Sequence, residues 1–146
     1  MTLDQWFQLA NVLALPGWIA LLLAPLRRGT ALAIARAIGV LLATGYLVGF
    51  LASLGSGNGL AGDYTLRGIA GFFADPRLAL IGWIHYLAFD LWVGAWEVEA
   101  AERAGMPHLL VVPALVLTFL LGPIGLLLFL LLRKINQLRN RPAAAS

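Results

Sequence analysis

Four apolar stretches of membrane-spanning length constrain the fold of this chain more than any other feature of its sequence. They run from about residue 6 to 26, 37 to 54, 76 to 97 and 109 to 132. A helix needs about 20 apolar residues to cross the hydrocarbon core of a bilayer, because each residue adds about 1.5 Å to its length. The chain of 146 residues is 61% hydrophobic and 12% charged, unlike an average soluble domain. We therefore expect an all-α integral membrane protein.

These stretches predict a bundle of four transmembrane helices that forms one domain over residues 1–141, followed by a disordered tail at 142–146. Asp75-Pro76 is a helix-start pair, because Asp accepts free amide hydrogens and Pro occupies the first helical position without losing a hydrogen bond. Between the second and third helices, residues 65 to 73 are too few to cross and should form a short interfacial helix capped by Thr65. In the fourth stretch the prolines and glycines predict a kink or unwound turn at Pro113, Gly122, Pro123 and Gly125.

Charge and cysteine content exclude several classes of protein. Basic residues cluster next to the ends of the apolar stretches, where they commonly flank transmembrane helices, so we expect no nucleic-acid partner. The absence of cysteine excludes disulfides, thiolate nucleophiles and Cys-ligated metals. The N-terminus lacks the basic region of a cleavable signal. With four spans both termini lie on one side, and six Lys or Arg residues there against four opposite favour termini inside the cell.

Asp90 is the first candidate functional residue, because it lies near the middle of the third apolar stretch. A bare carboxylate at bilayer depth costs about 2.5–3.5 kcal/mol on insertion scales, so it persists where something uses or pairs it. At about 100° per residue, Asp90 and Glu97 fall within about 20° of each other. Gly94 between them leaves room on that face for a ligand or a close helix. His85 is separated from Asp90 by about 140°, so a direct hydrogen bond between the two is not expected.

Several arrangements around Asp90 stay open at this stage. Asp90 and His85 converge on a ligand that lies across the helix, or Asp90 pairs with a polar group of another helix. Asn11 and Thr118 are the candidates for such a partner, and Trp92 is deep enough to flank a pocket. The plainer interpretations are structural pairing for Asp90 and an interfacial contact for His85.

The remaining ionisable residues of the third helix add one candidate. Glu97 lies near the predicted membrane edge with Glu99 and Glu102. A solvated helix end is the plainer interpretation for Glu99 and Glu102, and it is an alternative for Glu97. A metal site formed by His85, Asp90, Glu97 and His108 lacks any known ligand spacing, so we expect neither a metal nor another cofactor. The candidate catalytic residues are therefore His85 and Asp90. The candidate substrate-binding residues are Asn11, Trp92, Gly94, Glu97 and Thr118.

Most of the chain resembles the abscisic-acid-deficient-four-like family, the neoxanthin synthase-like group of small membrane proteins. The resemblance rests on FQLAN and LPGW at residues 7–11 and 15–18, GWIHYLAFDLWVG at 82–94, GMPHLLVVP at 105–113 and LTFLLGPIGLLL at 117–128. Many bacterial relatives have Arg where this chain has Ala95, so no anion or headgroup contact is implied at that position. Nine Arg to one Lys, abundant Ala and the lack of a transit peptide indicate a bacterial member, expected as a multi-pass protein of the inner membrane.

The resemblance implies action on a carotenoid or another isoprenoid lipid, because plant members are implicated in converting violaxanthin to neoxanthin. That isomerisation delivers a proton to an epoxide oxygen and removes another from carbon. Asp90 and His85 would supply the acid and the base. The alternative is a non-catalytic protein that binds a carotenoid or lipid or supports another enzyme, with both residues as contacts between helices. The expected partners are a membrane lipid or isoprenoid substrate, and a further copy of the chain in a homo-oligomer.

Overall fold

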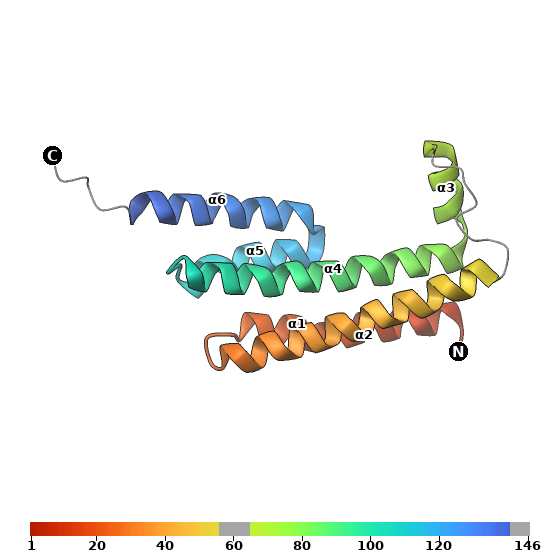
Figure 1. Cartoon of the computed structure of the whole chain (residues 1–146), viewed down its shortest axis with the longest axis horizontal. Helices are drawn as coiled ribbons and strands as arrows, with labels where there is room; N and C mark the ends of the chain where they lie inside the picture. Colours follow the sequence, from red (N-terminus) through yellow and green to blue (C-terminus); the bar gives the residue numbers. More distant parts are fainter. Residues whose placement is uncertain (56–64, 141–146) are drawn as a thin grey trace.

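Six helices make up the part of the chain that the computed structural model describes, residues 1–55 and 65–140. They are α1 (Leu3–Leu22), α2 (Arg28–Gly55), α3 (Leu66–Ala74), α4 (Pro76–Arg103), α5 (His108–Leu121) and α6 (Pro123–Arg139). Helices α1, α2 and α4 are long and apolar enough to cross a membrane, and they lie side by side along one axis (Figure 1). The all-α class and the first three apolar stretches are confirmed. The predicted tail at 142–146 lies outside the described residues.

The short helix predicted before α4 is present. Thr65 caps α3, with its hydroxyl accepting a hydrogen bond from the backbone N–H of Gly68 at 3.2 Å. Asp75 caps α4 in the same way through the N–H of Arg77 at 2.8 Å, and Pro76 takes the first helical position. In Figure 1, α3 lies across the direction of the long helices. Its position at a membrane interface remains a prediction.

The fourth predicted span is not one helix. The chain over residues 109–132 is divided into α5 and α6 by Gly122, and the two helices lie side by side and run in opposite directions (Figure 1). Gly122 has φ 44° and ψ −94°, a conformation that is open essentially to glycine alone. Pro123 then starts α6 because its ring favours the first helical position. The prediction of a break at these residues is confirmed, but the chain reverses there instead of continuing across.

The far end of the α5–α6 hairpin returns to the end of α4. After α4, Gly105 adopts φ 59°, and the N–H groups of Gly105 and Met106 donate to the carbonyls of Glu102 and Ala101, a Schellman arrangement. The side-chain amide of Asn136 in α6 donates to the carbonyl of Ala104 at 3.2 Å. The C-terminal ends of α4 and α6 are therefore neighbours.

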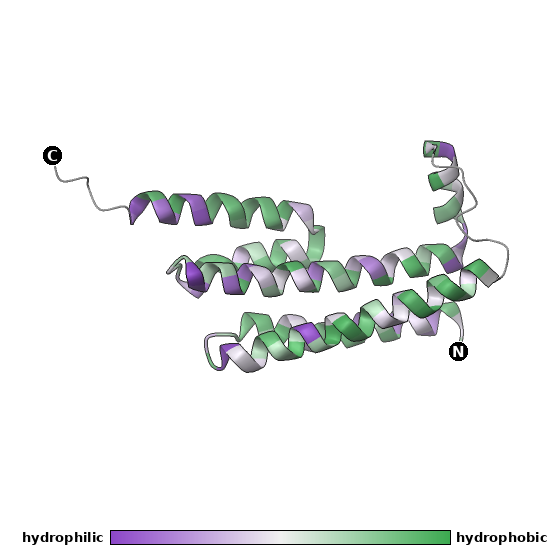
Figure 2. Ribbon diagram, viewed as in Figure 1, coloured by the Kyte–Doolittle hydropathy of each residue, from purple (hydrophilic) through white to green (hydrophobic). Residues whose placement is uncertain are grey.

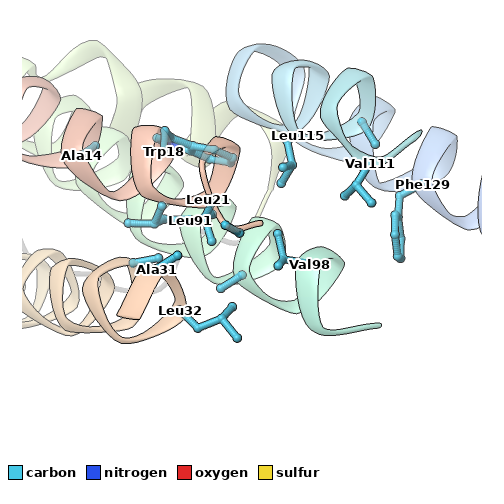
Figure 3. Close-up of a cluster of buried hydrophobic side chains, with 14 of the residues drawn as sticks. Ala14, Trp18, Leu21, Ala31, Leu32, Leu91, Val98, Val111, Leu115 and Phe129 are labelled. Carbon is cyan, nitrogen blue, oxygen red and sulfur yellow. The ribbon is translucent and has the colours of Figure 1, made fainter. Parts of the chain in front are cut away.

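The core lies between α1, α2 and α4 and continues from α1 and α4 to the hairpin. Figure 3 shows Trp18 and Leu21 of α1 near Leu91 of α4, and Leu115 and Phe129 on the hairpin helices. Outside this core the long helices present apolar side chains, and hydrophilic residues gather at the ends of α4 and α6 (Figure 2). This arrangement is the one expected for helices that face lipid.

Candidate functional site

Asp90 lies in the middle of α4, at the turn of the α5–α6 hairpin. A Cβ atom placed on Gly122 would lie 2.9 Å from its Oδ1, so the carboxyl group packs directly against the turn. The hydroxyl of Tyr86, one helical turn earlier, interacts with this carboxyl group. The side chain is partly covered, and its buried Oδ2 has no hydrogen-bond partner among the residues that the structure describes. One buried oxygen of Asp90 is thus left without a partner in the described part of the chain.

Glu97 is the second carboxyl group on the same face of α4, and it is fully buried. Its Oε1 accepts a hydrogen bond from the Thr118 hydroxyl of α5 at 2.9 Å, while its Oε2 has no partner within residues 1–55 and 65–140. A Cβ on Gly125 would overlap Thr118, so α5 and α6 are in close contact at this level. The sequence placed Asp90 and Glu97 on one stripe, and both do face the hairpin. The solvated helix end considered for Glu97 is wrong, because α5 covers it.

Two other predicted site residues are used in contacts between helices. The side chain of Asn11 accepts a hydrogen bond from the indole N–H of Trp83 at 3.2 Å and donates another to the carbonyl of Phe7 at 2.7 Å. A Cβ on Gly94 would lie 2.8 Å from the ring of Trp18. The room that Gly94 leaves on α4 is therefore filled by α1. Of the two alternatives predicted for this face, a ligand or a close helix, the structure has the close helix.

His85 and Trp92 lie on the α2 side of α4, away from Asp90. The His85 ring stacks on Phe89 with centroids 4.5 Å apart and contacts Tyr46 of α2 at 5.1 Å. Trp92 packs against Gly39 of α2, where a Cβ would lie 2.7 Å from the indole nitrogen. The structure thus brings together Asp90, Glu97 and Thr118 but leaves His85 and Trp92 on another face.

His108 has a structural contact at the start of α5. Its Nε2 lies 3.1 Å from the carbonyl oxygen of Leu22, the last residue of α1. Burial lowers the pKa of His108 below its usual range, and the nearby charge of Arg28 acts in the same direction. Residues 1–55 and 65–140 hold no group of three or more His, Asp or Glu side chains suited to a metal ion.

The sequence analysis missed Tyr86 and the role of Gly122. Tyr86 precedes Asp90 by four residues, the spacing that puts two side chains next to each other on a helix, so this pair was open to detection. The contact between Gly122 and Asp90 depends on the hairpin, and nothing in the local pattern of α4 indicates it. The site as built consists of Asp90, Tyr86 and the turn at Gly122, with Glu97 and Thr118 behind it.

Comparison with known proteins gives one match. The model of the family described as ABA DEFICIENT 4-like matches residues 5–129, which is most of the chain. No curated protein matches the chain. No solved structure matches it either.

Proposed function

The chain belongs to the ABA DEFICIENT 4-like family, and on that premise we propose that it acts on a carotenoid or other isoprenoid lipid at Asp90. The observation that carries the proposal is the half-covered carboxyl group of Asp90, whose Oδ2 has no partner in the described part of the chain. With α4 across a bilayer, Asp90 lies near its midplane. A carboxyl group there is costly unless a ligand or another polar group completes its contacts.

The depth of the hairpin turn supports a lipid as the ligand. Helix α5 has 14 residues and is thus about 21 Å long, shorter than the roughly 30 Å hydrocarbon core. A hairpin that starts at the end of α4 therefore turns inside the membrane. Irregular backbone at this depth is tolerated where it is buried or lines a polar site, and broken helices in transporters often mark binding sites. A lipid would reach Asp90 sideways from the bilayer.

Asp90 alone is sufficient for the acid–base step of an epoxide isomerisation. Its protonated carboxyl group gives the proton to the epoxide oxygen as the carbon–oxygen bond breaks. The resulting carboxylate then removes a proton from the neighbouring carbon, which forms the new double bond and restores the carboxylic acid. No electrons are gained or lost. Tyr86 would orient the carboxyl group through its interaction with it.

The second candidate function is binding or presentation of the lipid without chemistry. It is favoured by the position of His85, which the sequence suggested as the second acid–base group. His85 stacks on Phe89 and contacts Tyr46, on a different face of α4 from Asp90. Under this alternative Asp90 stabilises the hairpin turn and recognises a hydroxyl group of the ligand.

Substitution of Asp90 in a carotenoid-producing bacterial host distinguishes the enzyme from the binding protein. For the enzyme we expect Asp90→Asn to lower product formation by about 10²–10⁴-fold, the range typical of acid–base groups, with protein level unchanged. His85→Gln should leave product formation near wild type if Asp90 performs both proton transfers. Pigments are identified by mass spectrometry and protein is quantified in the same membranes.

Glu99→Gln is the matched control, because Glu99 is a carboxylate near the C-terminal end of the same helix, where it pairs with Arg36 of α2. It should not affect pigment composition. Full activity of Asp90→Asn together with co-purification of the lipid would leave binding as the function. A wild-type protein that neither changes pigments nor co-purifies with an isoprenoid would refute both candidates.

A further inference from the structure

A second feature of the molecule lies between α1, α2 and α4, away from Asp90. It is a groove with a volume of about 740 Å³. Leu3, Trp6 and Ala10 line it from α1, Leu41 and Gly45 from α2, and Ile81 from α4. Asp90, Tyr86 and Gly122 are not among the described residues that line it. A ligand in this groove would therefore not touch the site described above.

The dimensions of the groove limit what it can hold. Along α2 it extends from Leu41 to Ser53, which is about 18 Å at the rise of an α-helix. Its mean cross-section is then about 40 Å², or about 7 Å in diameter. Carbon atoms in contact lie about 4 Å apart, so a single unbranched alkyl chain would leave much of this width empty. A methyl-branched chain or one that ends in a ring fits better.

The polar groups of the groove lie toward one end. Asp75 and Arg77, at the start of α4, offer an acceptor and a set of donors on either side of the helix start. Because the two charges are opposite, this end suits a neutral hydroxyl or keto group better than a phosphate or a carboxylate. The rest of the lining is mainly apolar, apart from the hydroxyls of Thr44 and Ser53 on α2, of which Thr44 donates to the carbonyl of Val40.

We propose that the groove between α1, α2 and α4 is a binding site for an isoprenoid with a neutral polar end group, which lies at Asp75 and Arg77. The groove is about half as long as a bilayer is thick. It therefore accommodates a whole short isoprenoid alcohol or one end of a longer carotenoid. The proposal takes its lipid class in part from the proposed function, but it concerns a different surface. The two can therefore fail separately.

Gly45 provides the test, because it lines the groove and a Cβ there meets no atom within 4 Å. Leucine at this position should fill the groove without disturbing the helix. Gly29 is the matched control, since it lies in the same helix outside the groove and is equally open. Purified wild type, Gly45→Leu, Gly29→Leu and Asp90→Asn are incubated in detergent with geranylgeraniol. The alcohol that stays bound through gel filtration is quantified by mass spectrometry.

We expect wild type and Gly29→Leu to retain geranylgeraniol and Gly45→Leu to retain about tenfold less. Asp90→Asn should change retention less than Gly45→Leu does, because the alcohol lacks the epoxide on which the Asp90 site would act. Ala52→Leu, another groove position, is the second blocking variant if Gly45→Leu fails to fold as judged by its elution volume and helix content. Equal retention by wild type and the blocking variants would overturn the proposal. The proposal would also be overturned if wild type retained no geranylgeraniol. It would likewise be overturned if an unbranched alcohol of equal carbon number displaced bound geranylgeraniol as effectively as added geranylgeraniol does. Loss of retention in Asp90→Asn alone would assign the alcohol to the Asp90 site instead.

Discussion

At the scale of single residues, the two carboxyl groups of α4 differ in how well the chain covers them. Glu97 is fully buried and accepts a hydrogen bond from Thr118, whereas Asp90 is only partly covered and its Oδ2 has no partner among the described residues. The same helix face thus serves two purposes. Glu97 joins α4 to α5 through Thr118, and Asp90 packs against the turn at Gly122.

The role of Glu97 predicts the effect of removing its donor. Thr118→Val keeps the shape of the side chain but leaves both oxygens of Glu97 buried without a partner. We expect a loss of about 1–2 kcal/mol in the free energy of unfolding, since an unpaired buried polar group costs about 1–3 kcal/mol and contacts between membrane helices reach about 2. Thr118→Ser retains the hydroxyl and should lose less. Unfolding in mixed micelles measures both, and equal stability of Thr118→Val and wild type would contradict the role.

Among the helices, local patterns in the sequence predicted the features that depend only on residues close together in the chain, such as helix starts, caps and shared faces. The start of α4 at Asp75-Pro76, the cap of α3 at Thr65 and the common face of Asp90 and Glu97 all follow from short-range rules. The reversal at Gly122 was predicted only as a kink or unwound turn, because glycine and proline interrupt a helix without giving the direction in which the chain continues. That direction is fixed by tertiary contacts, as between Gly125 and Thr118.

The turn at Gly122 predicts that alanine is poorly tolerated there. An L-residue at φ 44°, ψ −94° is strained by about 1–3 kcal/mol, and its Cβ would also press on Oδ1 of Asp90. We expect Gly122→Ala to lower the free energy of unfolding by about 2 kcal/mol or more. Gly29→Ala, in an open helical position, should be neutral or slightly stabilising. In the double variant Gly122→Ala, Asp90→Ala, we expect recovery of only that part of the lost unfolding free energy that comes from the contact between the new Cβ and Oδ1 of Asp90. Similar unfolding curves for the two single variants would show that Gly122 is not required.

At the scale of the whole molecule, the hairpin changes the topology expected from four spans. Three helices of membrane length place the N-terminus at one end, while α6 returns its C-terminal end to the end of α4. Among the described residues, the Lys and Arg side chains are then divided unevenly. Two lie at the N-terminal end, Arg67 and Arg77, and seven lie at the other: Arg27, Arg28, Arg36, Arg103, Arg133, Lys134 and Arg139. The count of six against four that favoured both termini inside does not apply to this arrangement.

This distribution predicts that the ends of α4 and α6 face the cytoplasm and the N-terminus faces the opposite side, because positively charged flanks stay inside. The chain has no cysteine, so single cysteines can be placed without background. In intact cells a membrane-impermeant maleimide should label Asp4→Cys. Ala104→Cys and Gln137→Cys should react only after the cells are permeabilised. A continuous fourth span would instead put Ala104→Cys and Gln137→Cys on opposite sides. Labelling of one of these two but not the other in intact cells would therefore reject the hairpin, and with it the placement of its turn at Asp90 inside the membrane.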